Sequence, residues 1–127
     1  MFEVTIIKSF SSAHLLNQIG GKCEELHGHN FKVEVTVAAE KLNSSGLLID
    51  FRKVKKWLHE ILEQMDHKNL NDLSLFADVN PSSENIAEII CKQIEQSAKQ
   101  AKVRIARVKV WESENAAVTY IPDGNII

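Results

Sequence analysis

The sequence predicts an α+β domain in which an antiparallel four-stranded sheet carries two helices on one face. Two observations indicate this class: alternating apolar and polar residues recur near both ends of the chain, and two central stretches repeat apolar residues at helical spacing. The expected order is β-β-α-α-β-β. Since the 127 residues contain no internal repeat and no linker-like tract, we expect one domain over residues 1–127.

Four strands are predicted from period-two alternation. Residues 2–10 alternate with one exception, and residues 31–40 alternate strictly, which makes them the clearest strand of the chain. Residues 11–25 have no clear period and contain two adjacent glycines, so we expect a long loop there. Residues 103–112 and 116–121 are predicted as the last two strands, joined by a short turn.

Two helices are predicted between these pairs of strands. Asp50 is positioned to cap the first helix, and apolar residues recur at helical spacing over residues 51–65. Residues 66–80 are expected to be a loop. The second helix is predicted over residues 81–100, with Pro81 and one of the two following serines at its start.

Composition and charge exclude several classes of protein. The formal charge of −2 argues against an electrostatic nucleic-acid binder. Two cysteines far apart in the chain do not make a disulfide framework. No run approaches the roughly 20 apolar residues of a membrane span, and the first residues lack a signal-peptide pattern. We therefore expect a cytoplasmic protein whose partners include neither nucleic acid nor membrane.

Three histidines form a candidate metal site. His27 and His29 lie two residues apart, so their imidazoles share one face if the strand begins by His27. His14 follows the first strand, and a hairpin-like pairing would bring it alongside them. Three imidazoles describe a catalytic zinc with an open position, because structural zinc sites are usually closed by four protein ligands. The alternative is a set of surface or capping histidines.

Cys23 lies four residues before His27 and has two possible roles. It could be a fourth zinc ligand, which would close the site and make it structural. It could instead lie beside the metal as an acid–base group, with its pKa lowered by the nearby cation and imidazole. Spacing by itself does not separate these roles. Cys91 lies among isoleucines on the apolar side of the second helix, and we expect it to serve in packing.

Two acidic residues and one more histidine are further candidates. Asp66 and His67 follow the first helix, where a carboxylate can orient an imidazole for proton transfer. The alternative is a histidine stabilised by the helix dipole. Glu112 shares a face with two apolar residues at a strand end, which indicates either an acid that binds a ligand with paired N–H donors or a solvated end. Ser83 is explained by the helix cap alone, and His59 is expected to be solvated.

Six short motifs occur in order along the chain. They are SAH at 12–14, CEELHGHN at 23–30, LIDF at 48–51, MDHKNLND at 65–72, NPSSENIA at 80–87 and VWES at 110–113. Together, with compatible spacing and the same element order, they resemble the 6-pyruvoyl-tetrahydropterin synthase / 6-carboxy-tetrahydropterin synthase family. The resemblance covers nearly the whole chain, and its specificity comes from the combination of motifs.

The resemblance implies a role for each candidate residue. Three histidines match the zinc ligands of the family: His14, His27 and His29. Cys23 matches the catalytic cysteine, with Asp66 and His67 as its proton relay. Glu112 matches the acid that binds the pterin ring through two N–H donors. Ser83 matches a segment that lines the pterin pocket.

The resemblance also implies the tunnelling fold (T-fold) and self-association. Sheets from several subunits of such a protein close into a barrel with active sites between subunits, and we expect a trimer or a hexamer built as a dimer of trimers. Closure would cover the edges that a lone four-stranded sheet exposes. The implied substrate is a pterin triphosphate, 7,8-dihydroneopterin triphosphate, and the implied cofactor is Zn²⁺ acting as a Lewis acid.

The spacing between Cys23 and the His-Gly-His motif indicates the branch of the family. The pyruvoyl-forming branch is usually written with five intervening residues, whereas this chain has three. That resembles the bacterial 6-carboxy-tetrahydropterin synthase of queuosine biosynthesis, a carbon–carbon lyase that releases acetaldehyde and triphosphate. The alternatives are a 6-pyruvoyl-tetrahydropterin synthase and, outside the enzymes, a zinc-stabilised binding module.

Glu24 leaves a dual activity open. A related branch uses a glutamate three residues before the first histidine in place of the cysteine, and releases the side chain as an aldehyde to supply folate synthesis. Since Cys23 and Glu24 are both present, the chain resembles members proposed to serve both routes. Glu24 would then contact the substrate and lead to 6-hydroxymethyl-dihydropterin. Otherwise it is an ordinary loop acid.

Overall fold

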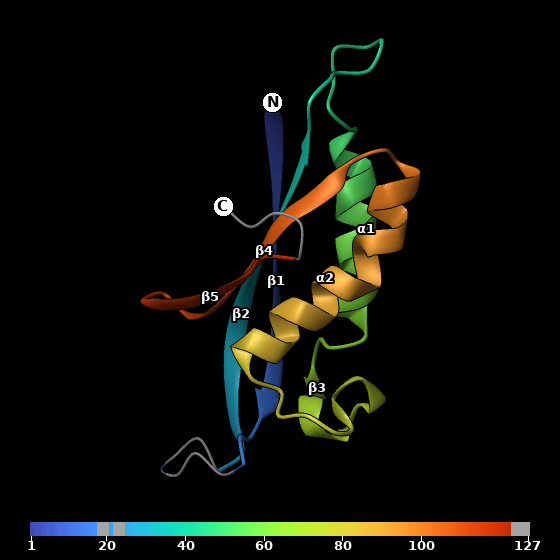
Figure 1. Ribbon diagram of the computed structural model, residues 1–127. Coiled ribbons are helices and arrows are strands. Elements are labelled where there is room, and N and C mark those ends of the chain that lie inside the picture. The colour runs from blue at the N-terminus through green and yellow to red at the C-terminus, as the bar shows by residue number, and fades with distance from the viewer. Residues whose placement is uncertain (18–20, 22–24, 123–127) are drawn as a thin grey trace.

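The computed structural model describes residues 1–17, 21 and 25–122, and this part of the chain holds two α-helices and one five-stranded sheet (Figure 1). In chain order the elements are β1 (Phe2–His14), β2 (His27–Ala39), α1 (Phe51–Glu63), β3 (Lys68–Asn69), α2 (Ser83–Gln100), β4 (Arg104–Ser113) and β5 (Ala116–Tyr120). Two short 3-10 helices, Leu70–Asp72 and Ser74–Phe76, lie between β3 and α2. The predicted α+β class is confirmed.

The sheet has the spatial order β3-β1-β2-β4-β5. The four longer strands are antiparallel to their neighbours, as predicted, and the two-residue β3 is an additional strand that runs parallel to β1. β1 and β2 pair along their full length, from Phe2 opposite Ala39 to His14 opposite His27. Figure 1 shows both helices on the same face of this sheet. No helix in the described residues is both long and apolar enough to cross a membrane.

β1 extends further than its sequence pattern indicates, so the predicted loop is wrong for residues 11–14. The polar Ser11 and Ser12 conceal the strand because a hydrophobic pattern stops before them. Their backbone pairs with β2 on one side, while on the other side the His67 N–H donates to the Ser11 carbonyl at 2.6 Å. Ser12 is buried, and its hydroxyl donates to the Met65 carbonyl. Tertiary pairing therefore completes the strand.

The hydrophobic core lies between the sheet and the two helices. Alternate residues of β2 form its centre and are fully buried: Phe31, Val33, Val35 and Val37. The helices contribute the residues expected from their spacing, among them Val54, Leu58, Ile61, Leu62, Ile86, Ile90 and Ile94. Cys91 is fully buried among them, and burial raises the pKa of its thiol to about 12. A thiol that stays protonated in the core serves in packing, as predicted.

Both helices begin at the predicted caps. The Asp50 carboxylate accepts the Arg52 N–H at 2.9 Å, and the Ser82 hydroxyl accepts the Asn85 N–H at 3.1 Å. Hydrogen bonds from the Arg52 side chain and backbone lower the pKa of Asp50 to about 2, so this cap stays ionised at ordinary pH. The second cap sets the start of α2 at Ser83.

Replacing Phe31 by alanine is expected to lower the free energy of unfolding by about 3–5 kcal/mol. Phe31 is fully buried and stacks on Phe10, with the ring centroids 5.0 Å apart. Its removal leaves a cavity that rigid strands cannot close. Urea unfolding at fixed protein concentration measures the change. The control is Phe51→Ala, at a side chain 56% exposed, which should change stability by about 0.5 kcal/mol or less. Equal effects of the two substitutions would contradict the assignment of Phe31 to the core.

Candidate metal centre

Three imidazoles converge at one end of the sheet. His14 closes β1 opposite His27, the first residue of β2, and His29 lies two residues further along the same face. The ring centroids of His14 and His27 are 4.5 Å apart, and those of His27 and His29 are 4.8 Å apart. Glu112 of β4 joins them, so that one ligand atom from each of the four side chains lies within 4.8 Å of the others. This group is called the His/Glu cluster below.

Two of the imidazoles are oriented by backbone carbonyls. Nδ1 of His14 lies 2.7 Å from the carbonyl oxygen of Pro81, and Nδ1 of His27 lies 2.7 Å from that of Glu25. A carbonyl can only accept, so each Nδ1 must carry the proton. With its one proton on Nδ1, a neutral ring presents its Nε2 lone pair to the cluster. This is the usual arrangement of a metal-binding histidine, whose second nitrogen donates to a carbonyl or carboxylate.

The His/Glu cluster is suited to a cation. Nε2 of His14 is buried and has no hydrogen-bond partner among the described residues, yet Oε1 of Glu112 lies only 3.2 Å away. The same oxygen lies 3.3 Å from Nε2 of His29. Lone pairs that face one another at this distance repel unless a cation or a proton lies between them. Tetrahedral zinc sites use three or four such protein ligands, so the three imidazoles could hold an ion with or without Glu112 as a fourth ligand. The residues therefore could hold a metal ion.

The lowered pKa of His29 also favours the binding of a metal ion. Burial lowers the pKa of His29, against the Glu112 carboxylate, which raises it. A lowered pKa leaves more of the ring neutral at any given pH. A metal ion therefore competes with a proton at this ring only under more acidic conditions than at an ordinary histidine.

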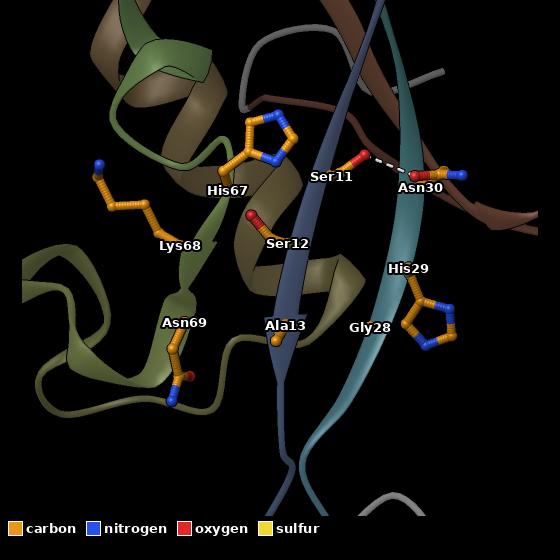
Figure 2. A pocket seen from close by; sticks show the side chains of 9 residues that line it. All are labelled: Ser11, Ser12, Ala13, Gly28, His29, Asn30, His67, Lys68 and Asn69. Atoms are coloured by element: carbon orange, nitrogen blue, oxygen red, sulfur yellow. Dashed lines mark hydrogen bonds between the residues drawn. The ribbon is translucent and has the colours of Figure 1, made fainter.

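A hollow of about 570 Å³ adjoins the cluster. It runs across the ends of β1 and β2 to β3 and is lined by Ser11, Ser12, Ala13, Gly28, His29, Asn30, His67, Lys68 and Asn69 (Figure 2). The hydroxyl of Ser11 donates to Oδ1 of Asn30 at 2.5 Å across its base. In Figure 2 the His67 ring lies on the β3 side of β1. The His29 ring lies beyond β2 and points away from the His67 ring. One hollow is thus lined both by His29, a member of the His/Glu cluster, and by His67.

Asp66 and His67 lie beside the first strand and not in the His/Glu cluster. Oδ1 of Asp66 accepts the Ser11 N–H at 2.9 Å, which attaches the turn after α1 to β1. His67 has a positive φ of 55°, a conformation that costs most residues energy and that here directs its N–H to the Ser11 carbonyl. Its side chain is 81% exposed, and Nε2 lies 3.7 Å from Oδ2 of Asp66. The predicted pair exists as a long ion pair at the surface.

Glu112 lies on the face predicted for it. Val108 and Val110 on the same side of β4 are fully buried, and Glu112 continues their face into the His/Glu cluster. Its side chain is 35% exposed and borders a second hollow of about 560 Å³. The sequence did not predict its place among the histidines, because that place depends on the register between β2 and β4.

Other predicted site residues fall in different places. Ser83, the first residue of α2, is buried, and its hydroxyl has no hydrogen-bond partner in the described part of the chain. Cys23 and Glu24 lie outside the described residues, so their roles stay predictions. His59 lies on α1 with a side chain 52% exposed and contacts Glu63 at 3.3 Å, as a solvated histidine would.

Among the polar residues that line the first hollow, sequence reasoning missed Asn30, Lys68 and Asn69. Asn30 directly follows the His-Gly-His motif, where period two would have placed it on the opposite face from His29. The other two form β3, whose pairing with β1 has no signal in so short a segment.

Known proteins with similar sequences indicate the family of this chain. The sequence profile described as 6-pyruvoyl tetrahydropterin synthase matches residues 3–123. The chain is 36% identical over 110 residues to dihydroneopterin monophosphate aldolase of Pyrococcus furiosus, covering 87% of this chain and 89% of that protein. It is also 36% identical over 114 residues to a putative 6-carboxy-5,6,7,8-tetrahydropterin synthase of Archaeoglobus fulgidus, covering 88% and 89%.

A solved structure agrees in fold over almost the whole chain. The 6-pyruvoyl tetrahydropterin synthase of Caenorhabditis elegans is similar with a TM-score of 0.86 and 27% sequence identity, over 96% of both chains. The fold and the site define the class of tetrahydropterin synthases with the T-fold. Within that class, the chain belongs to the 6-pyruvoyl tetrahydropterin synthase family. Its relatives are named for different products, so membership alone does not determine the reaction.

Proposed function

We propose that this protein is a zinc-dependent carbon–carbon lyase that converts 7,8-dihydroneopterin triphosphate and water to 6-carboxy-5,6,7,8-tetrahydropterin, acetaldehyde and triphosphate. The bond between the first and second side-chain carbons breaks, and so does the bond from the third carbon to the triphosphate oxygen. The first carbon is oxidised to a carboxylate while the ring gains two hydrogens, so no external oxidant is required. This product would enter queuosine biosynthesis in the cytoplasm.

The His/Glu cluster is the observation that carries the proposal. Neutral imidazoles with their Nε2 atoms converging suit zinc. In the part of the chain that the structure describes, the buried Nε2 of His14 has no hydrogen-bond partner, and zinc would supply the missing interaction. The choice of product follows from the three residues between Cys23 and His27, and from the similarity to a putative 6-carboxy-5,6,7,8-tetrahydropterin synthase.

The chain's own residues divide the chemistry between them. His14, His27 and His29 hold the zinc, which supplies Lewis-acid polarisation of the substrate's side-chain oxygens. Cys23 and His67 move protons at the side-chain carbons, and Asp66 orients the His67 ring. Glu112 and Ser83 bind the pterin ring. The hydroxyl of Ser83 is buried and has no partner within residues 1–17, 21 and 25–122, so it has hydrogen bonds to offer a ligand.

The active site is proposed to lie between subunits of a trimer or of a hexamer built as a dimer of trimers. His67 and His29 line the same hollow but do not point toward one another in one chain (Figure 2). β3 pairs with β1 only at Ser12 and Ala13, so the preceding part of β1 is a sheet edge, and β5 lies at the other edge. Exposed strand edges carry unpaired backbone N–H and C=O groups, which proteins usually protect, and pairing between subunits would cover both edges.

Identifying the products tests the proposed reaction. The zinc-loaded protein is incubated with 7,8-dihydroneopterin triphosphate, and the pterin and the small fragment are identified by mass. A 6-carboxy pterin with acetaldehyde is the expected result. A 6-pyruvoyl pterin would instead make the chain a 6-pyruvoyl-tetrahydropterin synthase. No turnover with zinc bound would favour a binding module, in which cobalt substitution should reveal Cys23 as a thiolate ligand.

A second candidate is cleavage to 6-hydroxymethyl-dihydropterin, alone or beside the main reaction. Glu24 lies three residues before His27, and the chain is similar to a dihydroneopterin monophosphate aldolase. The same product analysis separates this candidate, because the hydroxymethyl pterin differs in mass from the carboxy pterin. Its appearance would assign Glu24 to the site.

Replacing Glu112 by glutamine is expected to raise KM about 10–100-fold, because a charge-assisted pair of hydrogen bonds to the pterin is lost. Zinc affinity should change less than about threefold, since three imidazoles remain. Steady-state kinetics and competition with a chelating dye measure the two quantities, with the exposed Glu60→Gln as control. A tenfold or larger loss of zinc affinity would make Glu112 a metal ligand and contradict its role in substrate binding.

A further inference from the structure

Two asparagine side chains continue the hydrogen-bonded edge of β1 beyond β3. In an extended strand, the N–H and C=O groups of alternate residues point to the same edge. At this edge Ser11 bonds to Asp66 and His67, and Ala13 lies opposite Asn69. The next two positions of the series are residues 15 and 17, which pair with no strand of the described chain.

Asn71 pairs with residue 15 and Asn80 pairs with residue 17, each through both ends of its carboxamide. The Leu15 N–H donates to Oδ1 of Asn71 at 2.9 Å, and Nδ2 of Asn71 donates to the Leu15 carbonyl at 3.1 Å. The Asn17 N–H donates to Oδ1 of Asn80 at 2.9 Å, and Nδ2 of Asn80 donates to the Asn17 carbonyl at 3.0 Å. These two pairs are called the asparagine bridges below.

Only a carboxamide can form such a bridge, because it offers an acceptor and a donor side by side, like a peptide group. An aspartate of the same shape keeps the acceptor, but its second oxygen would face the carbonyl of Leu15 or Asn17 without a proton to share. The asparagine bridges therefore depend on the chemical identity of Asn71 and Asn80 and not on their size.

The bridge at Asn80 is connected directly to the His/Glu cluster. The next residue is Pro81, whose carbonyl accepts from Nδ1 of His14 at 2.7 Å. The carbonyl of Asn80 accepts from Nδ2 of Asn85 at 2.8 Å, which attaches the bridge to the first turn of α2. Residues 14 and 17 of one segment are thus bonded to residues 81 and 80 of another.

We infer that Asn71 and Asn80 are positioning residues for the metal centre. They hold the chain after His14 against the segment that supplies Pro81, and so keep the His14 ring in the tautomer and direction that present Nε2. They also hold the backbone at Asn17, six residues before Cys23. The bridge at Asn80 is solvent-exposed, where water competes with hydrogen bonds and their contribution to stability is small. Its effect is therefore on geometry more than on stability. This role rests on the proposed zinc-dependent function.

Asn80→Asp tests the inference, with Asn43→Asp as the matched control. Oδ1 of Asn43 accepts the N–H groups of Ser45 and Leu47 at 2.9 and 3.1 Å in a distant turn, and an aspartate can accept both. Zinc affinity is measured without substrate by competition with a chelating dye. The His14 ring is followed in the metal-free protein by the nitrogen-15 resonances of its imidazole. Thermal unfolding of the metal-free protein reports on stability.

Asn80→Asp should weaken zinc binding about 10–100-fold, shift the His14 ring resonances and leave the unfolding midpoint close to wild type. Asn43→Asp should change none of these. Zinc affinity within twofold of wild type, with unshifted His14 resonances, would overturn the inference. If Asn80→Asp does not fold, Asn71→Asp provides the same comparison. A wild-type protein that binds zinc but turns over no substrate would overturn the proposed reaction, while the effect of Asn80→Asp on affinity and on His14 would still be measurable.

Discussion

Replacing His29 by alanine is expected to weaken zinc binding more than about 100-fold and to remove turnover. Loss of a residue that only orients a ligand already costs about 10–100-fold in affinity or activity, so loss of a ligand itself should cost more. His29 is the suitable position because its side chain is 28% exposed, and truncation therefore disturbs packing less than at the fully buried His14.

Dye competition measures the zinc affinity of this variant, and product formation measures its turnover. Removing zinc from the wild type with a chelator should abolish activity in the same way, and adding zinc back should restore it. His59→Ala is the control, since His59 lies on α1 with a half-exposed side chain. A His29→Ala protein with wild-type zinc affinity would contradict the assignment of the cluster as the metal centre.

Replacing His67 by alanine is expected to lower kcat about 10²–10⁴-fold, the usual contribution of a general acid or base. Zinc affinity should stay close to wild type, because His67 is not in the His/Glu cluster. KM should also change little. Stability should be affected only slightly, since the ring is exposed and its contact with the Asp66 carboxylate is long, at 3.7 Å. Steady-state kinetics with zinc in excess measures the effect.

Mixing the two inactive variants tests whether the site is shared between subunits. If the His/Glu cluster of one subunit works with His67 of its neighbour, co-refolded His29→Ala and His67→Ala chains form some sites with both parts intact. Random assembly at equal amounts makes about a quarter of the sites complete. Recovery of about a quarter of the wild-type activity is therefore expected. No recovery in oligomers shown to contain both chains would place each site within one subunit.

Much of the fold could be predicted because its elements have local signals. β2 alternates apolar and polar residues from Phe31 onward. α1 and α2 carry apolar stripes, and each helix directly follows its capping residue, Asp50 or Ser82. The parts that were missed have no local signal. The last four residues of β1 are polar or small, and β3 is two residues long. Both are strands because of partners that lie far away in the sequence.

The candidate site divides in a similar way. The three histidines could be grouped because period two unites His27 with His29, and a hairpin between neighbouring strands reaches His14. The position of Glu112 among them could not be predicted, since it depends on the pairing of β2 with β4, which contains a register shift between Thr36 and Val37. The asparagine bridges are equally non-local, joining residues more than fifty positions apart in the chain.

The sequence by itself determined the α+β class, the helix starts and the residue types that could bind zinc, because alternation, capping and ligand chemistry depend on near neighbours. The tertiary structure alone decided that Glu112 faces His14 and His29, that His67 lies outside their cluster, and that two asparagines extend the edge of β1. Each of these depends on strand register and on contacts across the fold, where a shift of one residue turns a side chain to the opposite face.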